Sequence, residues 1–168
     1  MNIKEIELKA QEVLVKCGIS SVPIPVEDIA DKYGVQVSRA PSKEFSGILI
    51  RKENRSLMGI NSTESSVRQR FTVAHELGHY FLHGNRDVFV EYRDNGERVN
   101  KVRGFKETQA NIFAASVLMP KDLLEKDFKN IVKNDMLEDH HITFLAEKYD
   151  VSEKAMSFRL INLGLSKA

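Results

Sequence analysis

Two histidines and a glutamate occur together in the segment His75-Glu76-Leu77-Gly78-His79. On an α-helix, residues four apart differ by about 40° around the axis and about 6 Å along it. Both imidazoles can therefore reach one divalent ion at nitrogen–metal distances of about 2.0 Å. Glu76 lies beside the pair, where its carboxylate can act as a general base toward a water molecule. The spacing predicts a zinc site; the alternative is two ordinary hydrogen-bonded histidines at the border of a core.

The residues around this motif predict a helix that begins near Ser62–Ser66 and ends at Gly84. The spacing of Ser66 and Gln69 is that of a capping box. Apolar or small residues recur at helical spacing and define a buried face: Val67, Phe71, Ala74, Gly78 and Leu82. His75 and His79 fall at the border of this face, so we expect them to line a cleft.

A third ligand must come from elsewhere in the chain, and Glu107 is the strongest candidate. On the helix predicted from Phe105 to Met119, Glu107 projects onto the apolar face, with Asn111 one turn later. An isolated buried carboxylate is costly, and a zinc ion would be its partner. Asn111 could then accept the Nδ1–H of a ligand histidine or hold the carboxylate. The alternative is that Glu107 only complements the dipole of its helix.

Two segments together, RQRFTVAHELGHYFLH over 68–83 and ETQANIFAASVLMP over 107–120, resemble the ImmA/IrrE family of metallo-endopeptidases. The resemblance implies a zincin-like peptidase fold, with Zn²⁺ held by His75, His79 and Glu107 and with Glu76 as general base. It also implies a protein substrate, because better-known members cleave Xre-type helix-turn-helix repressors, often from a neighbouring gene, and so derepress mobile-element, phage or stress genes. The family commonly has Glu where this chain has Ser116, but helical direction puts Ser116 off the core face.

Peptide hydrolysis also needs a group that stabilises the carbonyl oxygen. His83, Tyr80 and Tyr92 are candidates, and the predicted catalytic set is Glu76, His83 and Tyr92. The alternative for His83 is that it caps the helix C-terminus. By analogy with the fold, we expect the substrate to lie extended beside an edge strand of a hairpin that is predicted over residues 45–61.

The chain of 168 residues predicts an α+β fold. Residues 1–120 would form the peptidase domain, with N-terminal helices, a small antiparallel sheet and two metal-binding helices. Strands over 45–51 and 56–61 are predicted to form a hairpin, and 88–92 has strand-like composition. Residues 121–168 would form a helical segment that resembles a helix-turn-helix and packs on the same unit.

A helix-turn-helix over Ile142–Gly164 would turn Lys154, Ser157 and Arg159 outward if it bound DNA. Residues 142–168 carry only four basic against three acidic side chains, and the formal net charge of the chain is +1. Phosphate contacts require more clustered positive charge, so we expect no direct DNA binding.

No stretch of the sequence is apolar over the roughly 18 residues of a membrane span, and no signal peptide is evident at the N-terminus. The single cysteine, Cys17, fits a reducing compartment, so we expect a cytoplasmic protein that does not contact membranes.

The alternative function is that of a zinc-containing regulatory or toxin-like protein that acts by binding DNA or a partner. A purely structural zinc site would have no use for Glu76 beside an open coordination position, so Glu76 favours the peptidase.

Overall fold

The computed structural model describes residues 1–52, 55–84, 88–92, 101–132 and 137–166, with only the backbone of residues 52, 92 and 101–103. The described helices are α1 (Ile3–Cys17), α2 (Val26–Lys32), α3 (Ser66–Leu82), α4 (Lys101–Leu118), α5 (Lys121–Ile131), α6 (Asp139–Tyr149) and α7 (Glu153–Asn162). The described strands are β1 (Val35–Ala40), β2 (Phe45–Lys52), β3 (Arg55–Asn61) and β4 (Val88–Tyr92). The predicted α+β class is confirmed.

The four described strands form one sheet in the order β1-β3-β2-β4. β2 and β3 form the predicted hairpin, and β4 pairs antiparallel with the other side of β2. The expectation of an antiparallel sheet fails for β1, which pairs parallel with β3. β1 and β2 run in opposite directions, and β3 of the hairpin lies between them. Because β3 also runs opposite to β2, it is parallel to its neighbour β1. Both hairpin strands therefore lie inside the sheet, and its edges in the described part of the chain are β1 and β4.

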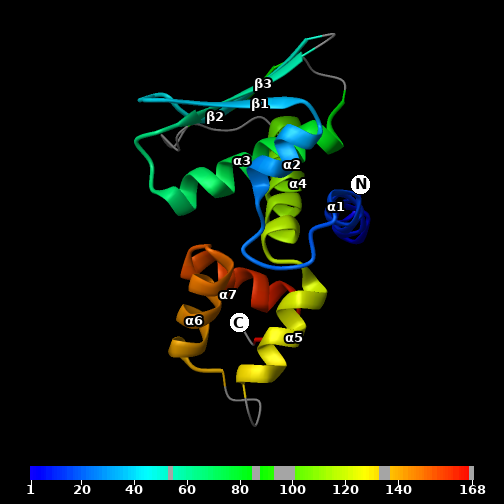
Figure 1. Ribbon diagram of the computed structural model, residues 1–168, viewed down its shortest axis with the longest axis vertical. Helices are drawn as coiled ribbons and strands as arrows, with labels where there is room; N and C mark the ends of the chain where they lie inside the picture. Colours follow the sequence, from blue (N-terminus) through cyan, green and yellow to red (C-terminus); the bar gives the residue numbers. More distant parts are fainter. Residues whose placement is uncertain (53–54, 85–87, 93–100, 133–136, 167–168) are drawn as a thin grey trace.

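The sheet lies at one end of the molecule and α5, α6 and α7 lie at the other, with α4 running between them (Figure 1). α3 packs under the sheet and against α4. A Cβ atom at Gly78 of α3 would lie 2.9 Å from the Cα and 3.0 Å from the carbonyl oxygen of Ala110 in α4. Glycine thus permits backbone contact between the two helices that carry the predicted ligands.

The ends of these two helices differ from the predictions. α3 begins at Ser66 with Ser65 as N-cap, whose side chain accepts a hydrogen bond from the Arg68 N–H. The expected Ser66–Gln69 capping box does not form, because the Gln69 side chain donates instead to the carbonyl of Glu64. α4 begins at Lys101 rather than Phe105, since its first turn lacks the apolar pattern by which helices are found.

α6 and α7 form the predicted pair, joined through Asp150 in the left-handed conformation with φ 52°. Met156 and Leu160 are buried on the inner face of α7. Arg159 is not outward, which corrects the arrangement expected for DNA binding. Its side chain is buried because the guanidinium donates to the Met119 carbonyl at 3.1 Å and pairs with Glu7 at 2.7 Å.

The predicted boundary at residue 120 falls between α4 and α5. Buried residues of α1, α4, α5 and α7 nevertheless belong to one hydrophobic cluster. The division into domains 1–120 and 121–168 stays a prediction. None of the helices in the described residues is long and apolar enough to cross a membrane.

Candidate metal centre

α3 and α4 bring His75, His79 and Glu107 together. Glu107 Oε2 lies 3.0 Å from His75 Nε2 and 3.4 Å from His79 Nε2. The two Nε2 atoms are 3.1 Å apart. Three ligands of a tetrahedral zinc ion at about 2.0–2.1 Å are separated by about 3.3–3.4 Å. The three side chains therefore could hold a metal ion and fit the size of one.

Asn111 orients the first of these histidines. His75 Nδ1 lies 2.9 Å from Asn111 Oδ1, and because an amide oxygen only accepts, Nδ1 carries the proton. Neutral His75 would then present the lone pair of Nε2 to a metal ion. Asn111 thus makes the contact expected from its place one turn after Glu107.

A longer chain of hydrogen bonds orients His79. The Gln109 amide donates to the Met1 carbonyl at 2.8 Å, which leaves Gln109 Oε1 to accept from His83 Nε2 at 3.0 Å. His83 Nδ1 is then unprotonated and accepts from His79 Nδ1 at 3.0 Å. The lone pair of His79 Nε2 is thereby directed at Glu107 and His75. Both ring nitrogens of His83 are engaged, which favours a positioning role over the predicted contact with a carbonyl oxygen.

The other residues considered from the sequence lie elsewhere or outside the described part. Tyr80 donates its hydroxyl to the Tyr33 carbonyl at 3.3 Å, so it is engaged away from the ligands. The side chain of Tyr92, a predicted catalytic residue, lies outside the described residues. Ser116 donates to the Ile112 carbonyl of its own helix at 2.8 Å and does not join the site.

Glu76 lies fully buried between α3 and β2. A Cβ atom at Gly47 of β2 would lie 2.7 Å from Glu76 Oε1, so glycine makes room for the carboxylate. Neither Glu76 oxygen has a hydrogen-bond partner among the described residues. Burial disfavours the charged form and raises the pKa of Glu76 to about 8. A buried carboxyl group without a hydrogen-bond partner is costly. A metal ion with a bound water molecule beside Glu76 would offset that cost.

The charges of the ligands in the metal-free chain follow from burial and mutual contact. Burial acts to lower the pKa of His75, but the Glu107 hydrogen bond and nearby carboxylates outweigh it, so the pKa is raised. Burial lowers the pKa of His79. Burial opposes ionisation of Glu107, yet hydrogen bonds from His75 and His79 lower its pKa to about 2. In the metal-free centre, the contact between the two side chains thus favours the ionised form of Glu107 and the protonated form of His75.

Sequence reasoning missed one acidic residue of the site, Glu91 of β4. One ligand atom each of His75, Glu76 and Glu91 lie within 4.8 Å of one another, a second grouping that could hold an ion. Glu91 is ion-paired with Arg68 at 2.8 Å. Alternation along the strand could have found it, since Glu91 shares a face with Phe89, which stacks on His79 at 4.4 Å between ring centroids.

The family model of the IrrE N-terminal-like domain matches residues 30–161. The chain is similar to the radiation response metalloprotease IrrE of Deinococcus radiodurans, with 43% identity over 67 residues, which are 39% of this chain and 20% of that protein. It is 27% identical over 123 residues to the metallopeptidase ImmA of Bacillus subtilis, covering 73% of this chain and 68% of ImmA. The matched stretch thus spans about a fifth of the length of the IrrE proteins.

A solved structure, of a Mycobacterium tuberculosis transcriptional regulator, has a similar fold. It matches with a TM-score of 0.65 at 14% sequence identity, over 94% of this chain and 46% of that one. At this identity the likeness shows the fold alone.

Proposed function

Because the chain belongs to the IrrE N-terminal-like domain family, we propose that it is a zinc-dependent endopeptidase that cleaves a protein substrate. One observation carries this proposal: two histidines and a carboxylate converge within 3.4 Å while a second, unpartnered carboxylate, Glu76, lies buried next to them. Three protein ligands leave one coordination position for water or substrate, as in catalytic rather than structural zinc sites.

Each residue of the centre has a distinct part in the proposed hydrolysis. Bound zinc would polarise the peptide carbonyl and lower the pKa of water near it. Glu76 accepts a proton from the attacking water and then donates it to the leaving amine. A zinc ion beside Glu76 would favour its ionised form, the form that the first step requires. Asn111 and His83 hold the ligand histidines in the tautomers that face the ion.

The substrate backbone would lie along β4. This strand is an edge of the sheet in the described residues and carries Phe89 and Glu91 into the site. An exposed strand edge offers unpaired N–H and C=O groups to an extended peptide. This replaces the hairpin edge expected from sequence, because both hairpin strands are paired on both sides.

We propose a helix-turn-helix repressor of the Xre type, encoded by a neighbouring gene, as the substrate. The family and the relatives' names, which describe a metallopeptidase and radiation response metalloproteases, support a protein substrate. The choice of a repressor follows from the resemblance of residues 68–83 and 107–120 to the ImmA/IrrE family. Direct DNA binding is disfavoured, since Arg159, one of three candidate contacts, is buried in an ion pair. The single Cys17 supports a reducing compartment, and we propose the cytoplasm.

The test combines the purified, zinc-loaded chain with the repressor encoded beside its gene and locates any cut by mass spectrometry. The wild type is expected to cut the repressor, and Glu76→Gln to bind zinc but not to cut. A repressor left intact by the wild type, or cut at the normal rate by Glu76→Gln, would overturn the proposed reaction or the proposed base.

A further inference from the structure

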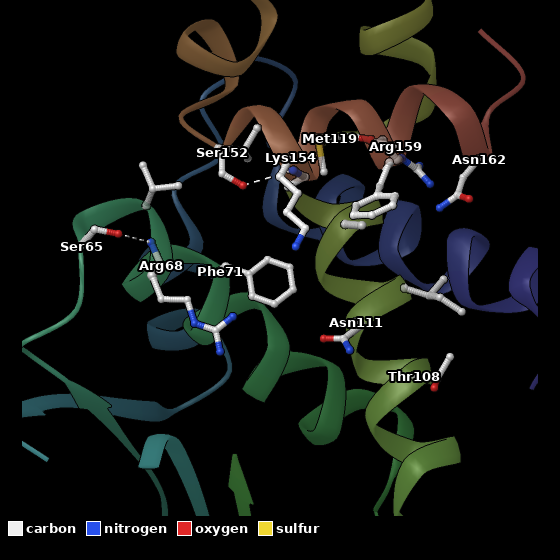
Figure 2. A pocket seen from close by; sticks show the side chains of 16 residues that line it. Ser65, Arg68, Phe71, Thr108, Asn111, Met119, Ser152, Lys154, Arg159 and Asn162 are labelled. Atoms are coloured by element: carbon white, nitrogen blue, oxygen red, sulfur yellow. Dashed lines mark hydrogen bonds between the residues drawn. The ribbon is translucent and has the colours of Figure 1, made fainter. Parts of the chain in front are cut away.

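A groove of about 540 Å³ lies between α3, α4 and α7. Figure 2 shows Phe71 of α3 and Asn111 of α4 on its walls, with Lys154 of α7 reaching across toward Phe71. Among the described residues, those of α7 contribute no ligand to the metal centre. This C-terminal helix thus forms one wall of a hollow to which it brings no metal ligand.

The groove is continuous with the metal centre. Asn111 lines the groove and also holds His75 Nδ1 at 2.9 Å. Phe71 lines it too, with its ring centroid 6.3 Å from that of His75. A polypeptide whose backbone passes the metal ligands would therefore have side chains within reach of the groove.

The lining of the groove is apolar with a cationic rim. Ile112, Ala115 and Met119 of α4 face Ala155 and Phe158 of α7 across it. Phe158 remains 57% exposed at the edge of these apolar walls.

Among the residues that the structure describes, the charged side chains that line the groove are all basic. Arg68 and Arg159 are paired with Glu91 and Glu7, respectively. Lys154 is exposed and has no ion-pair partner among the described residues.

We propose that this groove is the specificity site for the protein substrate, and that it takes a large apolar side chain whose neighbour in the substrate is acidic. Apolar walls favour the first feature and the unpaired Lys154 favours the second. The inference rests on the proposed function for its occupant, but binding in the groove can be measured without cleavage. It also gives α7 a part in peptide recognition in place of the DNA contact considered from sequence.

The experiment uses the full, zinc-loaded chain in the Glu76→Gln background, which keeps peptides intact, with ¹³C-labelled alanine and methionine methyl groups. The probe is a capped hexapeptide with Leu-Phe at its centre and Glu on both sides. Two comparison peptides replace Glu by Lys, or Leu-Phe by Gly-Gly. The methyl resonances of Ala115, Ala155 and Met119 report occupation of the groove.

Two pairs of variants separate the groove from general surface effects. Phe158→Ala is matched by Phe144→Ala, because Phe144 on α6 is 50% exposed but does not line the groove. Lys154→Glu is matched by Lys126→Glu on α5, likewise exposed and outside the groove. We expect affinity for the acidic peptide to fall about tenfold in Phe158→Ala and about fivefold in Lys154→Glu. Both matched variants should bind like the parent.

The expected result is a shift of the three methyl resonances with the acidic Leu-Phe peptide and much weaker shifts with the other two. The proposal is overturned if these methyls do not respond, if the lysine peptide binds equally well, or if Phe144→Ala weakens binding as much as Phe158→Ala. A short DNA duplex that shifts them in place of the peptide also overturns it. Peptide binding without repressor cleavage by the wild type would contradict the proposed function instead; cleavage without groove binding would contradict only this inference.

Discussion

His79 and His83 face each other through their Nδ1 atoms, 3.0 Å apart, across the C-terminal end of α3. Only one of these nitrogens can carry the proton, and Gln109 decides which by occupying the other side of the His83 ring. The direction of the His79 lone pair is thus set through a chain that ends at the backbone of Met1, which is more than a hundred residues from Gln109 in sequence.

Replacing His83 should therefore weaken metal binding without removing a ligand. We expect His83→Leu to lower zinc affinity about 10- to 100-fold, measured by competition with a chromophoric chelator. His83→Asn should recover much of the loss, because its Oδ1 lies near the position of Nδ1 and accepts a hydrogen bond. His140→Leu, at an exposed histidine on α6, is the matched control. Equal affinities for wild type and His83→Leu would remove the positioning role.

Gly78→Ala tests the contact between the two ligand-bearing helices. An alanine within a helix is ordinarily favourable by about 1 kcal/mol relative to glycine. Here the new Cβ would lie 2.9 Å from the Ala110 backbone and would push α4, with Glu107, away from the histidines. We expect a loss of about 1–3 kcal/mol in unfolding free energy from overpacking and a weaker zinc affinity.

The control for Gly78→Ala is Gly84→Ala, where the nearest atom to a new Cβ is 3.9 Å away. Denaturant unfolding and zinc competition of the two variants provide the comparison. A Gly78→Ala chain that is more stable than wild type and binds zinc normally would contradict the close contact.

The pH dependence of stability in the metal-free chain should change on replacing Glu76. Its pKa of about 8 in the folded state exceeds the ordinary value of 4.5, so the folded state holds this proton more tightly. The resulting stability is complete below pH 4.5 and is lost as the pH rises through 8. The Gln side chain of Glu76→Gln does not ionise, so this loss is absent from the variant. Between pH 5 and 8, its free energy of unfolding should therefore rise by roughly 2–4 kcal/mol relative to that of the wild type. Urea unfolding in the presence of a chelator measures it; parallel curves for the two chains would refute the buried, unpartnered acid.

Metal binding should release protons. His75 carries a raised pKa in the metal-free centre and must lose its proton to become a ligand. Glu76, with its pKa of about 8, should ionise when a cation lies beside it. Calorimetric titration with zinc in buffers of different ionisation heat counts these protons. At pH 7 Glu76→Gln should release about one fewer than wild type; equal counts would mean that Glu76 does not respond to the ion.

The helical parts of the site could be predicted because local spacing determines them. His75 and His79 share a helix face at four-residue separation, and Glu107 and Asn111 share another, so one contact between α3 and α4 suffices to join them. The position of β4 beside this contact depends on sheet order, which no local pattern encodes. Glu91 was therefore missed, and β1 was expected in the wrong kind of pairing.

Arg159 illustrates a different limit of sequence reasoning. An arginine on a surface-like helix predicts exposure, but Glu7 of α1 and the Met119 carbonyl together hold it in the interior. Such a partner lies 152 residues away in the chain and becomes visible only when the helices are assembled.

The most direct test of the metal centre is anomalous diffraction at the zinc absorption edge from a crystal of the zinc-loaded chain. We predict one strong peak at about 2.0–2.2 Å from His75 Nε2, His79 Nε2 and a Glu107 carboxylate oxygen. A peak bound instead by His75, Glu76 and Glu91, or no peak between α3 and α4, would contradict the account.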